Sequence, residues 1–315
     1  MNFNSRLPEP GVLWLDTAGN PIQAHGGGML YFNEKYYWYG ENKNGESWLP
    51  ECNIEWEGYR VEAIGINCYS SPDLLNWTNE GIVLPAVKND TSHDLHPSKV
   101  IERPKVIFNQ RTNQFVMWMH IDTMDYQYAR VGVAVSESPT GPFFYLGSMR
   151  PDDSDSRDMT LFQDTDGKAY LIYSSVWNSE LHISLLTDDY LKPSGEYVRK
   201  FVAHLKNQGP ESPAVFKHHN KYYLITSHCT GWDPNPAEYA MADSIMGPWK
   251  AMGNPCVGPG AETTFNAQGT YVFQVARWPG EYIFMADRWN KKDLKNSRYV
   301  WLPIHIQNEK LTIRL

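Results

Sequence analysis

The sequence has no run of lysine and arginine, no apolar run long enough to cross a membrane, and few cysteines. Of its 315 residues, 28 are Lys or Arg and 36 are Asp or Glu, which gives a net charge of −8 at pH 7. An acidic chain without a basic cluster is not expected to bind nucleic acid. The lack of a long apolar run argues in the same way against a membrane-spanning protein.

The four cysteines, Cys52, Cys68, Cys229 and Cys256, do not have the Cys-x-x-Cys spacing of a zinc site. Their spacing leaves open one or two disulfides or buried free thiols. Three possible metal ligands occur in the segment 93–96, His-Asp-Leu-His, but this segment is better interpreted as a polar loop. The sequence therefore predicts no metal site and no cofactor, and leaves a structural calcium open.

The chain opens with Met1-Asn-Phe-Asn, which lacks the basic and apolar stretch of a signal peptide. We therefore expect a soluble protein that is cytoplasmic, or secreted or periplasmic if a leader was removed before this numbering. Helical periodicity is weak throughout, and no low-complexity linker divides the chain. A single domain over residues 1–315 and a monomer are the expected organisation.

Aromatic residues are abundant, with 12 Trp, 19 Tyr and 12 Phe. Five times a short apolar run is followed, after a polar turn, by a second run that is rich in aromatic residues. The first runs end at Phe32, Phe108, Phe162, Phe216 and Phe273, and subtraction gives spacings of 76, 54, 54 and 57 residues. A period of about 50 residues built from short strands is typical of a β-propeller.

A further hairpin element follows the aromatic strands, for example in segments 133–143 and 239–249. In each, an apolar/polar alternation runs into a Ser, Asp, Gly and Pro turn before the next strand. Each repeat thus supplies four antiparallel strands, and the sequence predicts an all-β, five-bladed β-propeller. The surplus of the longer first repeat, 41–62, is predicted to be a long loop. Either 299–306 or 11–15 is expected to complete the ring.

Polar residues stand just before the first strand in four repeats, at positions that face the central funnel of a propeller. They are Glu102, Asp158, Glu211 and Gln268. Glycoside hydrolysis needs such convergence, because one acid must protonate the leaving oxygen while another group directs water. Crowded negative charge raises the pKa of one carboxyl, which produces an acid at neutral pH.

Other candidates are expected to contact a substrate. His25 precedes three glycines, which permit close backbone approach, and is expected to face the funnel. Residues in or after the aromatic strands offer surfaces on which a sugar ring can stack, although core packing is an equal alternative for each. These residues are Tyr126, Trp177, Asn178, Thr226, Trp232 and Trp289.

Together these segments resemble glycoside hydrolase family 43, whose members are five-bladed propeller glycosidases. The segment 158–171 is similar to the third-blade segment of that family, and the resemblance gives Asp158 the role of tuning the pKa of the acid. The segment 210–224 is similar to the one that carries the general acid, which implies this role for Glu211. The resemblance extends over nearly the whole chain.

The family usually has its catalytic base, an aspartate, before the first strand of blade one, but segment 23–30 has no carboxylate. The glycines after His25, the Glu102-Arg-Pro-Lys segment and Gln268 resemble the exo-β-1,3-galactanase branch. In that branch the missing base is replaced by the blade-two glutamate or by a glutamine in its imidic tautomer. The resemblance thus implies that Glu102 or Gln268 handles the water, without deciding between them.

The implied function is that of an inverting, exo-acting glycoside hydrolase that releases galactose from β-1,3-galactan, such as the arabinogalactan backbone. An oligo- or polysaccharide is then the partner. Another activity of the family, α-L-arabinofuranosidase or β-xylosidase, is one alternative, which the missing blade-one aspartate disfavours. A non-catalytic carbohydrate-binding propeller is another. The missing base favours it, Glu211 opposes it, and the fold alone does not decide.

Overall fold

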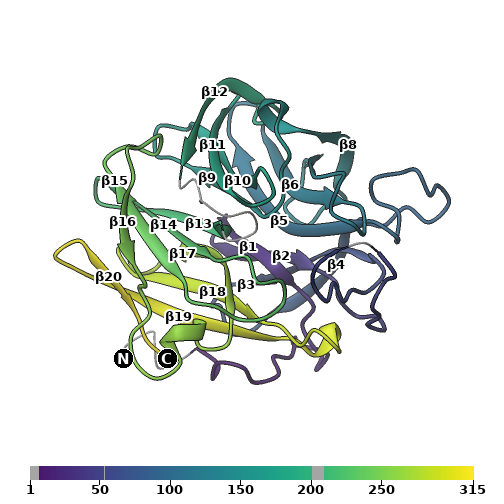
Figure 1. Cartoon of the computed structure of the whole chain (residues 1–315), viewed down its shortest axis with the longest axis horizontal. Helices are drawn as coiled ribbons and strands as arrows, with labels where there is room; N and C mark the ends of the chain where they lie inside the picture. Colours follow the sequence, from purple (N-terminus) through teal and green to yellow (C-terminus); the bar gives the residue numbers. More distant parts are fainter. Residues whose placement is uncertain (1–6, 53, 201–208) are drawn as a thin grey trace.

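A computed structural model of the chain describes residues 7–52, 54–200 and 209–315. In this part of the chain, twenty strands form five antiparallel sheets, each made of four consecutive strands. Figure 1 shows the sheets arranged as the blades of a ring, with the first strand of each blade toward its middle. The prediction of a five-bladed propeller with four strands per blade is confirmed.

The blades follow the chain in order. The first contains β1 (His25–Phe32), β2 (Lys35–Glu41), β3 (Gly65–Ser71) and β4 (Thr78–Pro85). The second contains β5 (Val100–Asn109), β6 (Gln114–Asp122), β7 (Arg130–Ser136) and β8 (Phe144–Met149). The third contains β9 (Met159–Gln163), β10 (Ala169–Ser175), β11 (Glu180–Leu186) and β12 (Pro193–Lys200).

The fourth blade contains β13 (Glu211–His218), β14 (Lys221–Ser227), β15 (Glu238–Ala242) and β16 (Lys250–Gly253). The fifth contains β17 (Gln268–Gln274), β18 (Tyr282–Arg288), β19 (Arg298–Gln307) and β20 (Lys310–Ile313). Three short 3-10 turns, η2 (Pro151–Asp153), η3 (Ala261–Thr263) and η4 (Leu294–Asn296), lie in the connections.

The hydrophobic core is divided into five clusters, one between each pair of neighbouring blades. Alternate side chains of a strand point to opposite faces of its sheet. In β10, Leu171 and Tyr173 therefore pack against blade two, whereas Tyr170 and Ile172 pack against blade four. The aromatic repeats seen in the sequence are the strands that fill both faces of each blade.

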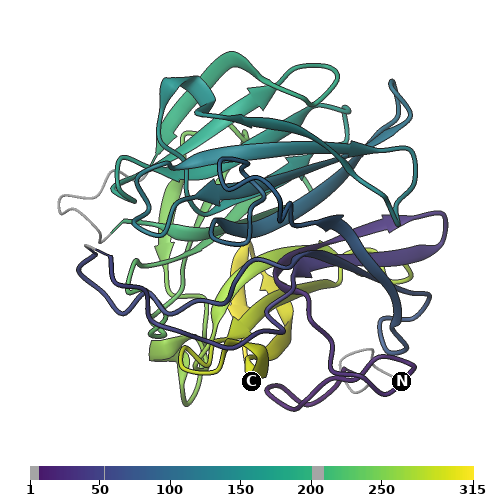
Figure 2. The same cartoon turned by 90° about the vertical axis from the view of Figure 1, so that its right-hand side faces the viewer.

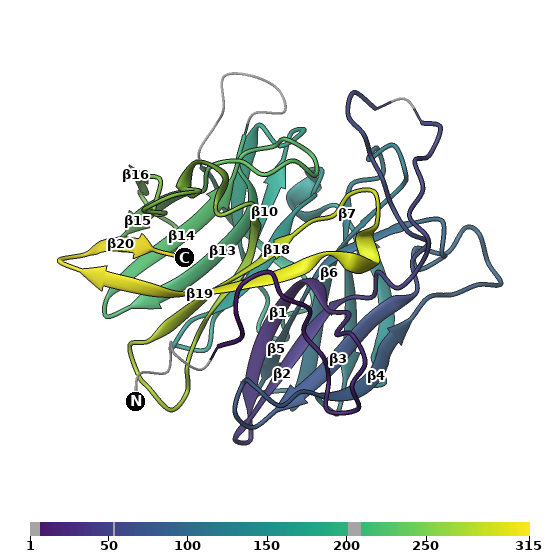
Figure 3. The same ribbon diagram turned by 90° about the horizontal axis from the view of Figure 1, so that it is seen from below.

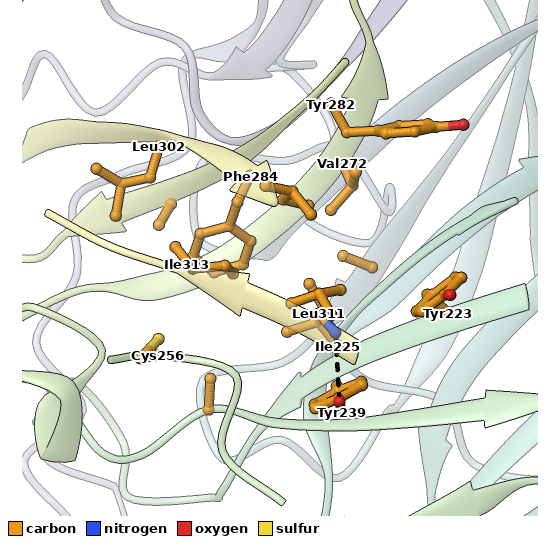
Figure 4. Packing of buried hydrophobic residues seen from close by; sticks show 14 of the residues in the cluster. Tyr223, Ile225, Tyr239, Cys256, Val272, Tyr282, Phe284, Leu302, Leu311 and Ile313 are labelled. Atoms are coloured by element: carbon orange, nitrogen blue, oxygen red, sulfur yellow. Dashed lines mark hydrogen bonds between the residues drawn. The ribbon is translucent and has the colours of Figure 1, made fainter. Parts of the chain in front are cut away.

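Figure 4 shows the cluster between blades four and five, where Phe284 and Val272 face Ile225 of β14. The cluster also receives Leu311 of β20, whose backbone N–H donates to the Tyr239 hydroxyl at 3.4 Å. Burying an apolar side chain of this size contributes about 2 kcal/mol to folding. Such contacts fix the angle between the two blades and hence the place of their inner strands.

The ring closes differently from the sequence prediction. Segment 299–306 belongs to β19, the third strand of blade five, and 11–15 adds no strand to a blade. Instead, the Trp14 ring packs between blades one and five, with its centroid 6.0 Å from that of Trp38 and 4.9 Å from that of Trp301. Side-chain packing, rather than a shared strand, therefore joins the last blade to the first.

The four cysteines are free thiols. The predicted long loop follows β2 and contains one isolated bridge, between Trp48 and Arg60. In Figure 2, the β1–β2 hairpin points toward one end of the molecule and this loop toward the other. Figure 3 shows the loop standing clear of the strands of blade one. Within the described residues, no helix has the length and apolar character needed to cross a bilayer.

Candidate active site

Four inner strands, β1, β5, β13 and β17, have an irregular register near the centre of the ring. In β5 the shift lies between Glu102 and Lys105, and in β13 between Glu211 and Ala214. Each of these two bulges contains a proline, which has no N–H to donate to the ladder. Because a bulge re-aims the neighbouring side chain, the shared Glu-x-Pro pattern directs both glutamates into one cavity.

This cavity has a volume of about 420 Å³ and is lined by residues from all five blades and from the long loop. Most of the candidates from the sequence lie in its wall. They are Glu102, Tyr126, Asp158, Trp177, Asn178, Glu211, Trp232, Gln268 and Trp289. The structure thus brings together residues that are far apart in the chain, including all four catalytic candidates.

Arg103 links three blades at the base of this cavity. Its Nε donates to Asp158 Oδ1 at 3.0 Å, and its Nη2 lies 2.8 Å from Asp158 Oδ2. The same Nη2 donates to Gln268 Oε1 at 2.7 Å. Ser212, in the β13 bulge, donates its backbone N–H and its hydroxyl to Asp158 Oδ2 at 3.0 and 2.9 Å. Charge-assisted bonds of this kind hold a carboxylate in one orientation.

Glu211 is placed to be protonated. Asn178 Nδ2 donates to its Oε1 at 2.6 Å. Burial, together with the nearby carboxylate of Asp158, raises the pKa of Glu211 to about 8. Because burial penalises the charged form and a neighbouring negative charge adds to that penalty, Glu211 keeps its proton at neutral pH.

Glu102 is in the opposite state. Burial would raise its pKa, but hydrogen-bonding to His120 and the positive charge of Lys43 lower the pKa to about 2. Its Oε2 lies 3.4 Å from His120 Nδ1, and the Tyr126 hydroxyl donates to Oε1 at 3.4 Å. Burial would lower the pKa of His120, but hydrogen bonds with Asp122 and Glu102 raise it to about 9. Glu102 is therefore an ionised carboxylate beside an imidazolium.

The Gln268 side chain has a fixed orientation. Its Oε1 accepts hydrogen bonds from Arg103 Nη2 at 2.7 Å and from Trp289 Nε1 at 3.0 Å. Guanidinium and indole N–H groups can only donate, so the atom that faces them is the amide oxygen. Nε2 donates to Ser227 Oγ at 3.2 Å. That bond uses one of two N–H groups and leaves the other for water or a sugar hydroxyl.

Sequence reasoning missed Glu41, which ends β2 and lies in the cavity wall. Its Oε1 accepts the Arg103 backbone N–H at 2.9 Å, and its Oε2 lies 2.7 Å from Lys43 Nζ. Burial raises the pKa of Glu41, and Lys43 opposes this rise. Blade one thus supplies a carboxylate from its second strand. Glu41 pairs across the strands with His25, and this cross-strand position is the signal that could have identified Glu41 as a site residue.

The glycines after His25 are explained by close packing. A Cβ on Gly26 would lie 2.0 Å from Glu41 Oε1, and a Cβ on Gly27 would lie 1.8 Å from the Tyr39 carbonyl oxygen. Gly26 also has a φ of +59°, which strains any residue with a Cβ. The predicted close backbone approach is therefore confirmed.

Two substrate-contact candidates do not line the cavity. His25 is fully buried behind the wall, with Nδ1 2.9 Å from Asp287 Oδ1 and its ring stacked on Tyr299 at a centroid distance of 4.8 Å. The prediction that His25 faces the funnel was wrong, because it packs against β18 and β19 instead. Thr226 pairs with Glu238 within the β14–β15 ladder. Its place in the strand keeps it out of the wall, which Cys229 reaches from the following loop.

Aromatic rings form one side of the cavity. The centroids of Trp232 and Trp289 are 5.0 Å apart. Trp56, from the long loop, lies 5.5 Å from Tyr126 and 6.4 Å from Trp232 by ring centroids. Trp177 of blade three also lines the cavity. Trp56 was not a candidate, because its loop has no regular pattern from which a position in space can be inferred.

One group in the described part of the chain has the composition of a metal site. Glu102, His120 and Asp158 bring possible ligand atoms within 4.8 Å of one another. Hydrogen bonds with Asp122 and Glu102 raise the pKa of His120 to about 9, however, and Asp158 is bound by both Nε and Nη2 of Arg103. A metal ligand must offer a free lone pair. These residues are therefore assigned to an ion-pair network.

Comparison with known proteins identifies the family of the chain. The sequence model described as "Glycosyl hydrolases family 43" matches residues 20–270. A curated relative, the β-D-galactofuranosidase xynD of Aspergillus niger, is 24% identical over 258 residues, which cover 74% of this chain and 71% of that protein.

Solved structures are more similar. A family 43 β-1,3-galactosidase in complex with galactodeoxynojirimycin is 39% identical with a TM-score of 0.89, and the match covers 98% of each chain. The exo-β-1,3-galactanase of Phanerochaete chrysosporium in complex with galactose is 35% identical with a TM-score of 0.84. That match covers 96% of this chain and 66% of the longer fungal protein. From the family match and these similarities over nearly its whole length, the chain belongs to glycosyl hydrolase family 43.

Proposed function

We propose that this glycosidase releases galactose from the non-reducing end of β-1,3-galactan, with inversion at the anomeric carbon. The observation that carries the proposal is the difference in protonation between Glu211 and Glu102, which line one cavity. One carboxyl keeps its proton at neutral pH and the other does not, which is the division that glycoside hydrolysis requires. The substrate class comes from the β-1,3-galactosidase and exo-β-1,3-galactanase relatives.

In this proposal Glu211 is the general acid. Its proton passes to the glycosidic oxygen as the bond from that oxygen to C1 breaks, so the leaving sugar departs as a neutral alcohol. The carboxylate that forms is stabilised by the Asn178 amide and by the positive charge of Arg103. Asp158 acts before this step, because its negative charge keeps the proton on Glu211.

The attacking water is handled by Gln268 and Glu102. The imidic tautomer of Gln268 would carry a proton on Oε1, where Arg103 and Trp289 already point two donors. We therefore assign Gln268 to orienting the water through its second N–H. Glu102, which is ionised, takes the proton as the water oxygen bonds to C1.

The aromatic wall supports binding of a sugar chain end. Tyr126, Trp232 and Trp289 present ring surfaces beside the polar groups that carry the chemistry. Rings of this kind offer an apolar surface on which the apolar face of a sugar can stack. The long loop brings Trp56 against Tyr126 and Trp232, so a segment of blade one helps to enclose the terminal residue.

The test is a comparison of sugars released from β-1,3-galactan, arabinan and xylan, with Glu211→Gln as the control. The proposal predicts galactose as the released monosaccharide, and only from galactan. Release of arabinose or xylose by the wild type would assign one of the other activities. Binding of galactan without any release would identify a carbohydrate-binding propeller.

A further inference from the structure

The thiol of Cys229 lies beside the proposed acid. Cys229 follows β14 by two residues, lines the cavity, and is within hydrogen-bonding reach of Glu211. Asn178 Nδ2 donates both to Glu211 Oε1 at 2.6 Å and to Cys229 Sγ at 3.3 Å. The Asn178 amide of blade three thus links the carboxyl of Glu211 to the thiol of Cys229, both of blade four.

The S–H of Cys229 is free to donate toward Glu211. Because the Asn178 N–H points at Sγ, the sulfur is an acceptor from the amide, and its own S–H is the atom available for the carboxyl. Burial raises the pKa of the Cys229 thiol, and the proximity of Glu211 raises it further. The thiol is therefore protonated at neutral pH, which makes it a poor nucleophile and a hydrogen-bond donor.

We propose that Cys229 is a positioning residue for the acid, whose S–H donates to the Glu211 carboxylate and sets how readily Glu211 gives up its proton. This inference rests on the proposed function only in naming Glu211 as the acid. A thiol is a weaker donor than a hydroxyl. Cys229 therefore stabilises the carboxylate less than a serine or threonine would, and Glu211 stays protonated to a higher pH.

Three other charged groups face Glu211: Asp158, Arg103 and Glu102. Asp158 and Glu102 raise the pKa of Glu211, and Arg103 lowers it. Asp158 comes from blade three, and Arg103 and Glu102 come from blade two. Arg103 binds Asp158 and Gln268, Ser212 donates to Asp158, and Glu102 lies beside His120. These contacts do not involve the thiol. A change at Cys229 alone therefore reports on the S–H donor.

The test compares Cys229→Ser, Cys229→Ala and Cys229→Val by the pH dependence of kcat/KM on a β-1,3-galactan oligosaccharide. The alkaline limb reports the pKa of the acid in the free enzyme. Serine is a stronger donor, so the limb should move to lower pH, by about half a unit or more. Alanine and valine cannot donate, so the limb should move to higher pH. Valine also fills the space, which prevents water from replacing the thiol.

Cys52 provides the matched control. Its thiol donates to the Met124 carbonyl at 3.5 Å, in a different depression of the surface. Cys52→Ser and Cys52→Ala should therefore leave the alkaline limb in place. An equal limb in all Cys229 variants, or a fall in kcat without any shift, would overturn the proposal. So would movement of the serine and valine variants in the same direction.

A second measurement does not depend on turnover. Infrared difference titration, with Glu211→Gln subtracted, follows the protonated carboxyl of Glu211 in the absence of substrate. The same opposite shifts for serine and valine are expected there. If the wild type released no galactose, the proposed function would fail, while this titration would still decide whether the thiol donates to Glu211. Unshifted titration curves would reject the inference even in an active enzyme.

Discussion

The carboxylate of Glu41 occupies the space into which a side chain on residue 26 would project. A Cβ on Gly26 would lie 2.0 Å from Glu41 Oε1. That oxygen is held by the Arg103 backbone N–H at 2.9 Å, and the other carboxylate oxygen lies 2.7 Å from Lys43 Nζ. The glycine and the glutamate therefore depend on each other, and this arrangement supports the Arg103 bulge on which Asp158 and Gln268 rest.

We predict that Gly26→Ala destabilises the protein by about 3 kcal/mol or more, because the new methyl group meets a carboxylate that cannot move freely. The matched control is Gly167→Ala. Gly167 also has a positive φ, +83°, but its Cβ would meet nothing within 4 Å. That control should cost only the backbone strain of about 1–2 kcal/mol. Denaturant unfolding monitored by tryptophan fluorescence measures both.

The double variant Gly26→Ala with Glu41→Ala tests whether the two residues interact. Removing the Glu41 side chain removes the clash, so the two changes together should cost less stability than the sum of the single changes. Simple additivity in this cycle would show that the Gly26 requirement comes from the backbone alone.

Glu211→Gln should lower kcat on galactan by several orders of magnitude while KM changes little. Glutamine keeps the shape of the side chain and the contact with Asn178 but cannot donate a carboxyl proton. Steady-state kinetics on an unactivated oligosaccharide measure the loss, and thermal unfolding checks that the variant folds. Turnover close to wild type would remove Glu211 from its role.

Glu102→Gln and Gln268→Ala should differ in how much turnover they lose. If Glu102 accepts the proton from water, Glu102→Gln loses turnover by orders of magnitude, whereas Gln268→Ala is impaired but active. Gln268→Glu should retain some activity and change the pH profile, because a carboxylate titrates. A dead Gln268→Ala beside an active Glu102→Gln would reverse the assignment and make the glutamine the base.

Azide gives an independent reading of the same question. A small anion can replace the water when an inverting enzyme has lost its base, so azide should restore turnover in Glu102→Gln and produce galactosyl azide. Gln268→Ala, which keeps its base, should show no such product. Mass spectrometry of the products distinguishes the two. Azide product from Gln268→Ala alone would contradict the role given to Glu102.

We expect kcat/KM to fall as the pH rises through about 8, because Glu211 must be protonated to act and its pKa is about 8. Asp158 contributes to that raised pKa. Asp158→Asn removes the negative charge, lowers the pKa of Glu211 and should move the alkaline limb to lower pH. An alkaline limb that stays in place in Asp158→Asn would mean that burial alone sets the pKa of Glu211.

The five blades could be predicted from the sequence because each repeats the same strand pattern, with a phenylalanine such as Phe108 or Phe216 near the end of its first strand. The catalytic candidates could be predicted from the sequence for a related reason. Glu102 and Glu211 share a Glu-x-Pro pattern at the start of an inner strand, and in the structure each borders a bulge that turns it inward.

The remaining features depend on contacts between segments that are distant in the chain. Glu41 enters the site through cross-strand pairing, and His25 is drawn away from the cavity by Asp287 of another blade. Trp56 reaches the wall from an irregular loop. None of these positions follows from strand periodicity. Periodicity predicts which face of a strand carries a side chain, but it does not predict which residue of another segment that side chain contacts.

The most direct test of the account is proton NMR of the first turnovers on β-1,3-galactotriose. Inversion by a water that attacks opposite Glu211 predicts α-galactose as the first sugar released, together with the disaccharide, before mutarotation produces the β-anomer. Under the same conditions, the Glu211→Gln variant should release neither product. Appearance of β-galactose first, or the absence of free galactose from the wild type, would contradict the account.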